Sequence, residues 1–416
     1  MTVSENRRRI PSVGGAFALW RDIRFQRFAF QALFAALIFF AAYVLFTNTD
    51  RSLESLNLEP FPFIETKSSF PFIDVHKDFL GQRAGFGIDE RAFGFDYSPN
   101  QNYLRALQAG LLNTIQVSFI GILLATVLGV VAGIARLSTN WLVSRVAMLY
   151  VETFRNIPLL LQLIFWYLAV FLKAPRIADS FDLFGVAFLS NRALALPSLE
   201  TKDGADLWAL ALLGAFAIAA VAKVVQTRRQ DERGKPTYPW WTASGVFVAI
   251  AAVAFLATGL PLSIDLPEAG RTSFSGGMTI SPEFAALLTG LSVYTGSFIA
   301  EIVRGSIQAI PKGQTEAAAA LGLTTAERMR FVILPQAMAI IIPPLTNQYL
   351  NLMKNSSLAV AVAFKDLFDV TRITANQSGQ FVPLVTLVML TYLTMSLTIS
   401  AVMNGLYSRL QWRKAR

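Results

Sequence analysis

The chain has 416 residues, of which 54% are hydrophobic and 15% charged, and it contains no cysteine and a single histidine, His76. Without cysteine there is no disulfide or thiolate metal site, and one histidine nearly excludes a histidine-ligated metal. Soluble domains carry about 25% charged residues, and several apolar runs here reach the roughly 20 residues that cross a bilayer, so we expect an integral membrane protein. The net charge of +9 comes from basic residues at the ends of these runs, which fits cytoplasmic loops better than nucleic-acid binding.

The N-terminal residues 1–27 are basic and precede an apolar run at 28–47. A signal peptide would place a shorter apolar stretch nearer the start and end it in small residues, so this run predicts an uncleaved first transmembrane helix with a cytoplasmic N terminus. Residues 48–108 are polar but rich in phenylalanine. We expect them to form a packed periplasmic loop, either a cap on the helices or a contact surface for a partner protein.

The second span is predicted at about 111–135, where Gly129 and Gly133 have the GxxxG spacing that lets membrane helices approach closely. In the third span, which ends near residue 172, Pro158 should kink or break the helix. Glu152 and Arg155 precede this proline on one helical face, three residues apart, and predict an ion pair near the cytoplasmic interface.

Two further spans at about 207–225 and 240–260 contain almost no polar residue, which indicates lipid-facing scaffold. The link between them is strongly basic from Arg228 to Lys235, so we expect it in the cytoplasm. Residues 173–204 should then be periplasmic by alternation.

Three more spans are predicted at about 283–302, 335–353 and 383–406, followed by a basic tail at 409–416. The first ends in Glu301 and Arg304, a second ion pair at i,i+3 spacing. Pro343 and Pro344 lie within the second and predict a break there. Eight spans in all place both termini in the cytoplasm, and every short basic loop then falls on that side.

The 305–334 loop connects two of these spans and reads as a short helix, a turn at Gly322 and a second helix that Thr325 can cap. A helix of small residues suits insertion into a groove on another protein, although an ordinary connecting helix is the alternative. The residues that stand out are Glu316, Ala317, Ala318, Gly322, Leu334 and Pro335. This pattern resembles the EAA loop of permease subunits in bacterial ABC importers. The segment from Tyr150-Val151-Glu152 through Arg155 and Pro158 to Gln162 resembles the histidine/glutamate/glutamine/arginine class of amino-acid permeases.

The resemblance implies an all-α membrane fold with a five-helix type I permease core at 109–172 and 281–408. The first span and an inserted helical hairpin at 173–280 would extend it to about eight helices, as in the Q-type permeases of general L-amino-acid importers. It also implies that the six residues above contact a separate ATPase.

The partners that the resemblance implies are a homologous permease subunit, two ATPase copies and a periplasmic amino-acid-binding protein, all at the bacterial inner membrane. This chain lacks a G-x-x-x-x-G-K-[ST] motif, so ATP and Mg would be bound by the ATPase. We expect no cofactor, metal or catalytic residue in this chain.

A polar stripe follows the two prolines, with Gln348, Asn351 and Asn355 at i, i+3 and i+7. It predicts either a substrate pathway, which would include Lys354 and Ser357, or hydrogen bonds between helices. Lys354 would meet a substrate carboxylate, or pair with Asp366 or a partner subunit. Because the stripe has no carboxylate, it favours broad or polar and acidic L-amino acids over purely cationic ones. An ion-coupled secondary transporter is the alternative function, and a membrane enzyme is disfavoured because the spans hold no catalytic constellation.

Overall fold

The computed structural model describes residues 77–233 and 238–414. The chain divides into two units, 1–80 and 81–416, and in the first only the short helix α3 (Lys77–Leu80) is described. The expected first span at 28–47 and much of the 48–108 loop therefore lie outside the described residues.

The second unit is mainly helical, as the hydrophobic pattern predicts. Its long helices are α4 (Tyr103–Ala135), α5 (Trp141–Asn156), α7 (Ala205–Arg233), α8 (Pro239–Ala257), α9 (Pro282–Gln308), α12 (Leu334–Asn355) and α14 (Phe381–Lys414). Shorter helices are α6 (Leu159–Phe165), α10 (Lys312–Ala320), α11 (Thr325–Arg328) and α13 (Leu367–Ser378). The 3₁₀ and π segments are η1 (Ala92–Gly94), η2 (Trp166–Phe171), η3 (Ile177–Asp179), η4 (Met329–Ile333) and η5 (Ser356–Val362).

Six of the described helices are long and apolar enough to cross a membrane, or seven if the bent pair of α5 with α6 and η2 counts as one span. The chain is therefore a multi-pass membrane protein. The predicted number of eight would require the run at 28–47, which is not described.

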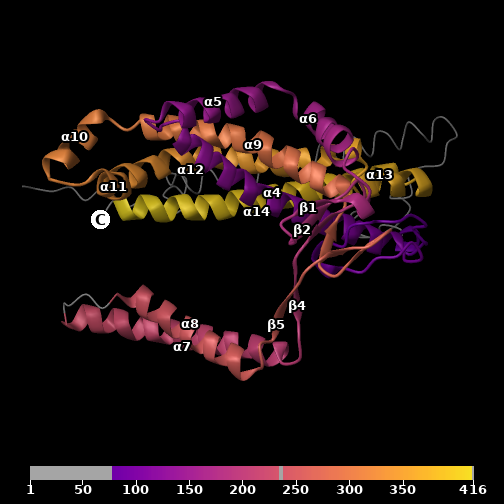
Figure 1. Ribbon diagram of the computed structural model, residues 1–416, viewed down its shortest axis with the longest axis horizontal. Coiled ribbons are helices and arrows are strands. Elements are labelled where there is room, and N and C mark those ends of the chain that lie inside the picture. The colour runs from indigo at the N-terminus through magenta and orange to yellow at the C-terminus, as the bar shows by residue number, and fades with distance from the viewer. Residues whose placement is uncertain (1–76, 234–237, 415–416) are drawn as a thin grey trace, which may run out of the picture. The chain divides into compact units, whose positions relative to one another are not determined.

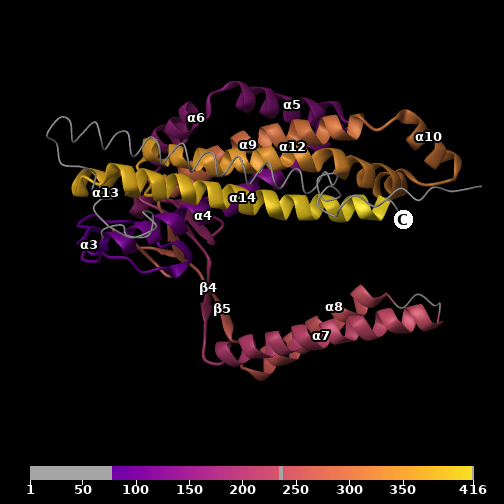
Figure 2. The same ribbon diagram turned by 180° about the vertical axis from the view of Figure 1, so that it is seen from behind.

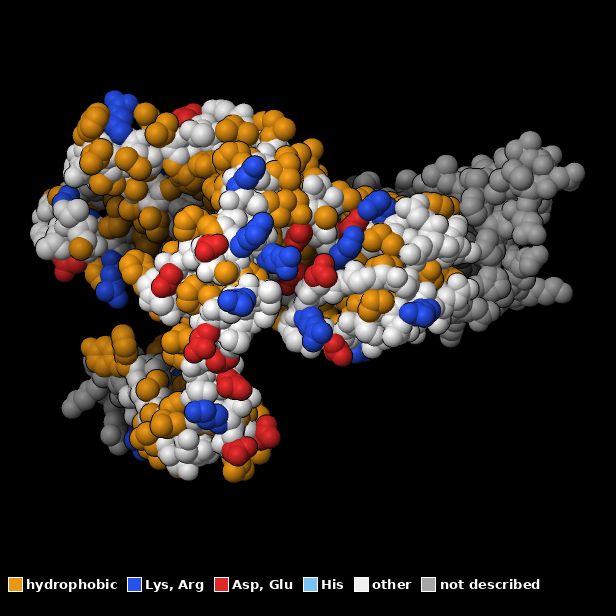
Figure 3. Space-filling view, turned by 45° about the vertical axis from the view of Figure 1, so that its right-hand side comes forward, with side chains coloured by type: hydrophobic (Ala, Val, Ile, Leu, Met, Phe, Trp, Pro, Cys, Tyr) orange, Lys and Arg blue, Asp and Glu red, His pale blue; other side chains and the backbone are white. Residues whose placement is uncertain are grey.

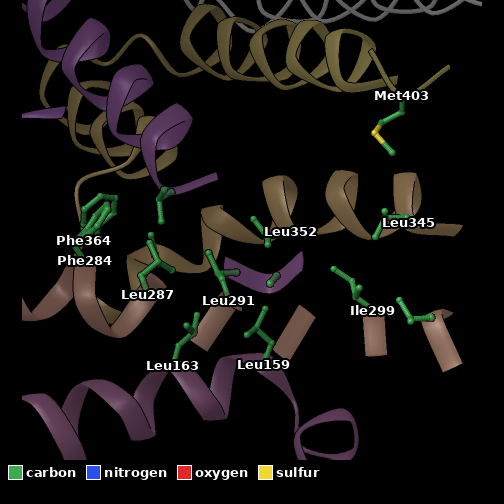
Figure 4. Packing of buried hydrophobic residues seen from close by; sticks show 14 of the residues in the cluster. Leu159, Leu163, Phe284, Leu287, Leu291, Ile299, Leu345, Leu352, Phe364 and Met403 are labelled. Atoms are coloured by element: carbon green, nitrogen blue, oxygen red, sulfur yellow. The ribbon is translucent and has the colours of Figure 1, made fainter. Parts of the chain in front are cut away.

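The core is built around α9, which packs against α4, α5 and α12, while α14 packs against α12 (Figures 1 and 2). Fully buried side chains from α6, α9 and α12 meet in one cluster, which includes Leu163, Leu287, Leu291, Ile299 and Leu352 (Figure 4). Hydrophobic side chains also dominate much of the outer surface, whereas charges of both signs gather at the end of the bundle that carries the strands (Figure 3). An apolar exterior is what a lipid-facing surface requires.

The predicted close approach at Gly129 and Gly133 is confirmed, and the neighbouring helix is α9. A Cβ atom on Gly129 would lie 2.5 Å from the Cβ of Ile299 and 2.8 Å from the carbonyl oxygen of Gly296. A Cβ on Gly133 would lie 2.7 Å from the carbonyl oxygen of Ala300. Only glycine fits at both positions, so these two residues set the distance between the helices.

The predicted break at Pro158 is also confirmed, because α5 and the following helix meet at 105°. Gln162 is buried just after the break and donates from Nε2 to the carbonyl oxygens of Phe154 at 2.8 Å and Ile157 at 2.9 Å. These carbonyls belong to the end of α5, where no further helical turn supplies donors. Gln162 therefore stabilises the bend.

The predicted break at Pro343 and Pro344 is wrong, because α12 continues through both residues. The prolines remove two N–H donors, but Ile342 and Leu345 are buried against the core on either side and hold the helix in place. The helix instead changes to the 3₁₀ segment η5 at Ser356 and ends at Ala363, whose φ is 59°.

Strands form in the segments around the α7–α8 hairpin, which we expected to be loops. β1 (Phe181–Leu183), β2 (Ala187–Leu189), β3 (Leu194–Leu196) and β8 (Met278–Ile280) make an antiparallel sheet in the order β1-β2-β3-β8. β4 (Ser198–Thr201) pairs with β5 (Leu262–Asp265), and β6 (Glu268–Ala269) pairs with β7 (Phe274–Ser275). The β4–β5 ribbon carries the α7–α8 hairpin, in which the indole Nε1 of Trp208 donates to the carbonyl of Ala251 at 3.2 Å.

The described part of the predicted 48–108 loop is packed, in agreement with its phenylalanine content. Ala84, Ile88 and Tyr97 are buried in it. The carboxylate of Glu90 accepts a hydrogen bond from the backbone N–H of Ser281 at 2.8 Å, at the start of α9. Burial raises the pKa of Glu90 above its usual value, although the bond to Ser281 acts in the opposite direction.

Candidate functional site

The 305–334 loop folds as two short helices joined by a turn at Gly322. The φ of Gly322 is +77°, which an L side chain rarely adopts. The N–H groups of Gly322 and Leu323 donate to the carbonyls of Ala319 at 2.9 Å and Ala318 at 3.2 Å, so they close the end of α10 as a Schellman motif. The predicted glycine turn is therefore present.

The second helix of the loop is capped by Thr324 and not by Thr325. The hydroxyl of Thr324 accepts from the backbone of Glu327 at 3.4 Å, and the Glu327 carboxylate accepts from the Thr324 N–H at 2.8 Å. This reciprocal capping box satisfies two donors at the start of α11. The sequence Thr324-Thr325 offered two candidates, and the glutamate three residues after the first identifies the right one.

Most of the residues predicted to meet an ATPase are exposed in the isolated chain. Only Ala318 is buried, and the other five are exposed: Glu316, Ala317, Gly322, Leu334 and Pro335. Sequence reasoning missed three large hydrophobic side chains of the loop, Leu321, Phe331 and Met329, which are 81%, 61% and 39% exposed. Exposed apolar side chains beside small ones indicate a protein contact surface.

The loop is a continuous extension of the bundle. α11 runs through the π segment η4 directly into α12. The amide Nε2 of Gln336 donates to Oε1 of Gln314 at 3.2 Å, so it joins the base of α12 to α10. Ile307 and Ile310, which lead out of α9, pack against the core cluster. The loop is therefore attached to both α9 and α12, which lie next to each other (Figure 1).

An ion-pair network lies at the same end of α9, one to two turns before the loop. Its centre is Glu301, whose carboxylate contacts the guanidinium groups of Arg304 and Arg136 and lies 3.8 Å from that of Arg155. Arg136 also lies 3.8 Å from the carboxylate of Glu152. The network joins α9 to α5 and to the end of α4.

The prediction for these four residues was half right. Glu301 and Arg304 form the expected i,i+3 pair. Glu152 and Arg155 do not bridge to each other, because Arg136 and Glu301 from neighbouring helices are better placed for them. Spacing along one helix cannot reveal partners that come from other helices.

The predicted polar stripe lies on the face of α12 that is turned away from the core of this chain. Asn351 and Lys354 are exposed, Gln348, Asn355 and Ser357 are partly exposed, and the opposite face, with Leu352 and Met353, is buried. The three amides form no hydrogen bond with any described residue. Within the described part of this chain they therefore do not act as hydrogen-bond links between helices, and they are available to a ligand or a second subunit.

Asp366 is not a partner for Lys354, because it is fully buried at the start of α13. Its carboxylate accepts from the backbone N–H of Asp369 at 2.9 Å and lies 3.3 Å from the hydroxyl of Tyr392 on α14. The hydroxyl of Thr114 on α4 accepts from the N–H of Leu367 at 2.9 Å. Burial raises the pKa of Asp366 to about 7, although its hydrogen bonds act in the opposite direction.

This geometry agrees with the similarity to known proteins. Residues 125–416 match the family of binding-protein-dependent transport system inner membrane components. The chain belongs to this family. The general L-amino acid transport system permease protein AapQ of Rhizobium johnstonii is 46% identical over 330 residues, which cover 78% of this chain and 81% of that one.

Two further relatives are also described as amino-acid transport permeases. The putative amino-acid ABC transporter permease protein YhdX of Escherichia coli is 43% identical over 80% of this chain and 84% of its own. The glutamate/glutamine/aspartate/asparagine transport system permease protein BztB of Rhodobacter capsulatus is 39% identical over 81% of this chain and 85% of its own.

The chain is thus an ABC transporter permease subunit and not an enzyme. The recognition from the EAA-like pattern is confirmed, and so is the expected fold class, a mainly helical permease. The roles of individual loop and stripe residues stay predictions.

Proposed function

We propose that this permease carries L-amino acids from the periplasm to the cytoplasm as one subunit of an ATP-driven importer. The observation that carries the proposal is the 305–334 loop, which exposes small and apolar side chains and is fixed to both α9 and α12. A transporter that works without an ATPase needs no such loop. The family adds support, because its members belong to binding-protein-dependent systems.

The coupling follows from the rigid attachment of the loop. An ATPase that holds Glu316, Ala317 and the neighbouring apolar side chains moves the loop when it closes on ATP. Because α11 is continuous with α12, the motion reaches the polar stripe without a hinge. Two ATPase copies and a homologous permease subunit would complete the transporter, and the stripe would face that second subunit across the substrate pathway.

A broad or polar and acidic substrate range fits the stripe. Relatives are described as permeases for general L-amino acids and for glutamate, glutamine, aspartate and asparagine. Neutral amides both donate and accept hydrogen bonds, so they tolerate several side chains. Lys354 adds a positive charge that attracts the carboxylate of any amino acid.

The proposed orientation places both termini and the 305–334 loop in the cytoplasm, with the described sheet in the periplasm. The chain has no cysteine, so single cysteines give a clean readout. Asp96→Cys should react with an impermeant thiol reagent in intact spheroplasts, and Arg229→Cys should react only after permeabilisation. Equal labelling from outside would contradict this topology.

The function is tested by reconstituting the permease with its co-purifying subunits and binding protein and measuring uptake of labelled glutamate and arginine. Uptake should stop when ATP is depleted. Uptake that persists on a proton gradient without ATP would support the ion-coupled alternative instead.

The ATPase contact has its own test. Glu316 is exposed and has no partner among the described residues, so Glu316→Gln should leave the fold intact. A lost charge-assisted hydrogen bond weakens association by about 10- to 150-fold, which corresponds to about 1.5–3 kcal/mol. Glu200→Gln, an exposed carboxylate on β4, serves as the control and should retain full ATPase binding.

A further inference from the structure

A groove opens between α12 and α14, on the side of α12 that does not carry the polar stripe. It encloses about 640 Å³. Its α12 wall has the helical spacing i, i+4, i+7 and i+11, and its α14 wall completes it. The lining residues are Met338, Ile342, Leu345 and Tyr349 on α12, and Met403, Leu406, Arg409 and Leu410 on α14.

The walls of this groove are apolar. The hydroxyl of Tyr349 is hydrogen bonded to Oγ1 of Thr126 at 2.8 Å. The aromatic ring of Tyr349 therefore lines the groove, and its hydroxyl does not. Met403 and Leu345 face each other from the two helices (Figure 4). A ligand held here must therefore be a hydrocarbon over most of its length.

Arg409 is the exception, and it lies near one end of the groove. It is exposed and forms no ion pair or hydrogen bond with any described residue. It also belongs to the basic end of α14, where Arg413 and Lys414 follow in the sequence. The groove thus joins an apolar channel to a cation that has no partner within the described chain.

The length of the groove matches one leaflet of a bilayer. Eleven residues separate Met338 from Tyr349, which is about 16 Å along a helix. The hydrocarbon core of a membrane is about 30 Å thick, so the groove is about as long as one leaflet is deep.

The groove is partly open to its surroundings, so an acyl chain, a single file of methylene groups, can enter it from the side. Charge favours a phospholipid as the occupant, because its phosphate supplies the counter-charge that Arg409 lacks within the described residues.

We propose that this groove binds one acyl chain of an anionic phospholipid from the leaflet next to the basic end of α14, and that Arg409 pairs with the phosphate of that lipid. The apolar walls bury the chain. The charge-assisted contact at Arg409 selects an anionic headgroup over a zwitterionic one, whose positive group opposes the arginine.

The site is tested on the full-length permease in detergent by native mass spectrometry, with phosphatidylglycerol and phosphatidylcholine as the probes. The wild type should retain about one phosphatidylglycerol in preference to phosphatidylcholine. Arg409→Gln should weaken that binding about fivefold, the change expected from one cation beside an anionic lipid. Arg145→Gln removes an exposed cation on α5 and should change nothing.

A second measurement locates the lipid. Phosphatidylglycerol with a photoreactive acyl chain should crosslink to 338–349 and 403–410, and Leu345→Trp should remove these crosslinks by filling the groove. Crosslinks spread evenly over the lipid-facing helices would overturn the proposal. So would equal binding of both lipids, the same loss in Arg145→Gln as in Arg409→Gln, or crosslinking of the groove to a segment of protein.

Discussion

Replacing Gly322 tests whether the shape of the 305–334 loop transmits the work of an ATPase. Gly322 has a φ of +77° and no atom within 4 Å of the position that a Cβ would take. A substitution there therefore changes the backbone preference of the turn without a clash. It also leaves the exposed side chains that would touch the ATPase unchanged.

The expected effect is graded. Alanine at a left-handed φ costs about 1–2 kcal/mol, which shifts the balance between the native turn and its alternatives by about 5- to 30-fold. Proline fixes φ near −65° and removes the N–H that donates to Ala319 at 2.9 Å, so the native turn cannot form. Gly322→Ala should lower ATP-driven uptake by up to about 30-fold, and Gly322→Pro should abolish it.

The assay is uptake of labelled amino acids by the reconstituted transporter, with the level of inserted permease measured in the same membranes. Gly313→Ala is the matched control, because Gly313 lies in α10 with open space around it and gains helix propensity as alanine. Uptake and ATPase stimulation that survive Gly322→Pro would refute the role of this turn.

The remaining predictions concern the bundle, the buried carboxyl and the stripe. Gly129→Leu should destabilise the detergent-solubilised permease by about 1–3 kcal/mol in thermal unfolding, because its Cβ would lie 2.5 Å from α9, whereas Gly214→Leu, with no atom within 4 Å, should not. Asp366 has a folded pKa raised to about 7, above its unfolded value of 3.8, so its contribution to stability is complete below about pH 4 and is lost as the pH rises through 7. Asp366→Asn should flatten this pH dependence, and a wild-type stability that rises between pH 5 and 8 at this site would contradict the assignment. Asn355→Asp should lower glutamate uptake far more than arginine uptake in competition assays with the same binding protein, because a like charge about 4 Å away costs about 4 kcal/mol at an effective dielectric near 20. An equal loss of uptake for both substrates would mean that the partner proteins, and not this stripe, determine selectivity.

The sequence predicts the spans well because apolar length and small-residue spacing are local properties. The six described spans and the bent pair all fall where apolar runs occur. Pro158 breaks its helix as expected, yet Pro343 and Pro344 do not. The difference is tertiary, since buried neighbours on both sides of the paired prolines keep α12 helical and no local signal reports them.

Sequence reasoning missed α13 and the strands for a related reason. α13 has twelve residues and a mixed polar sequence, so it lacks the apolar run that revealed the other helices. Its boundaries were nevertheless readable, because Asp366 is an N-cap and Gly379, with a φ of 73°, follows its last turn. The strands are two to four residues long, which is too short for an alternating pattern to stand out.

The arrangement of α9 and α12 fits the proposed coupling of the loop to the polar stripe. α9 carries the Glu301 network at the point where the chain leaves for the loop, and α12 carries the polar stripe after the chain returns. The network ties α9 to α4 and α5, so we expect a force on the loop to move these helices together. α12 has its own continuous connection with α11, so we expect the stripe to move with it. Alternating access in this permease should therefore come from rotation of a packed group of helices against the second subunit, and not from local unwinding of α12 at its prolines.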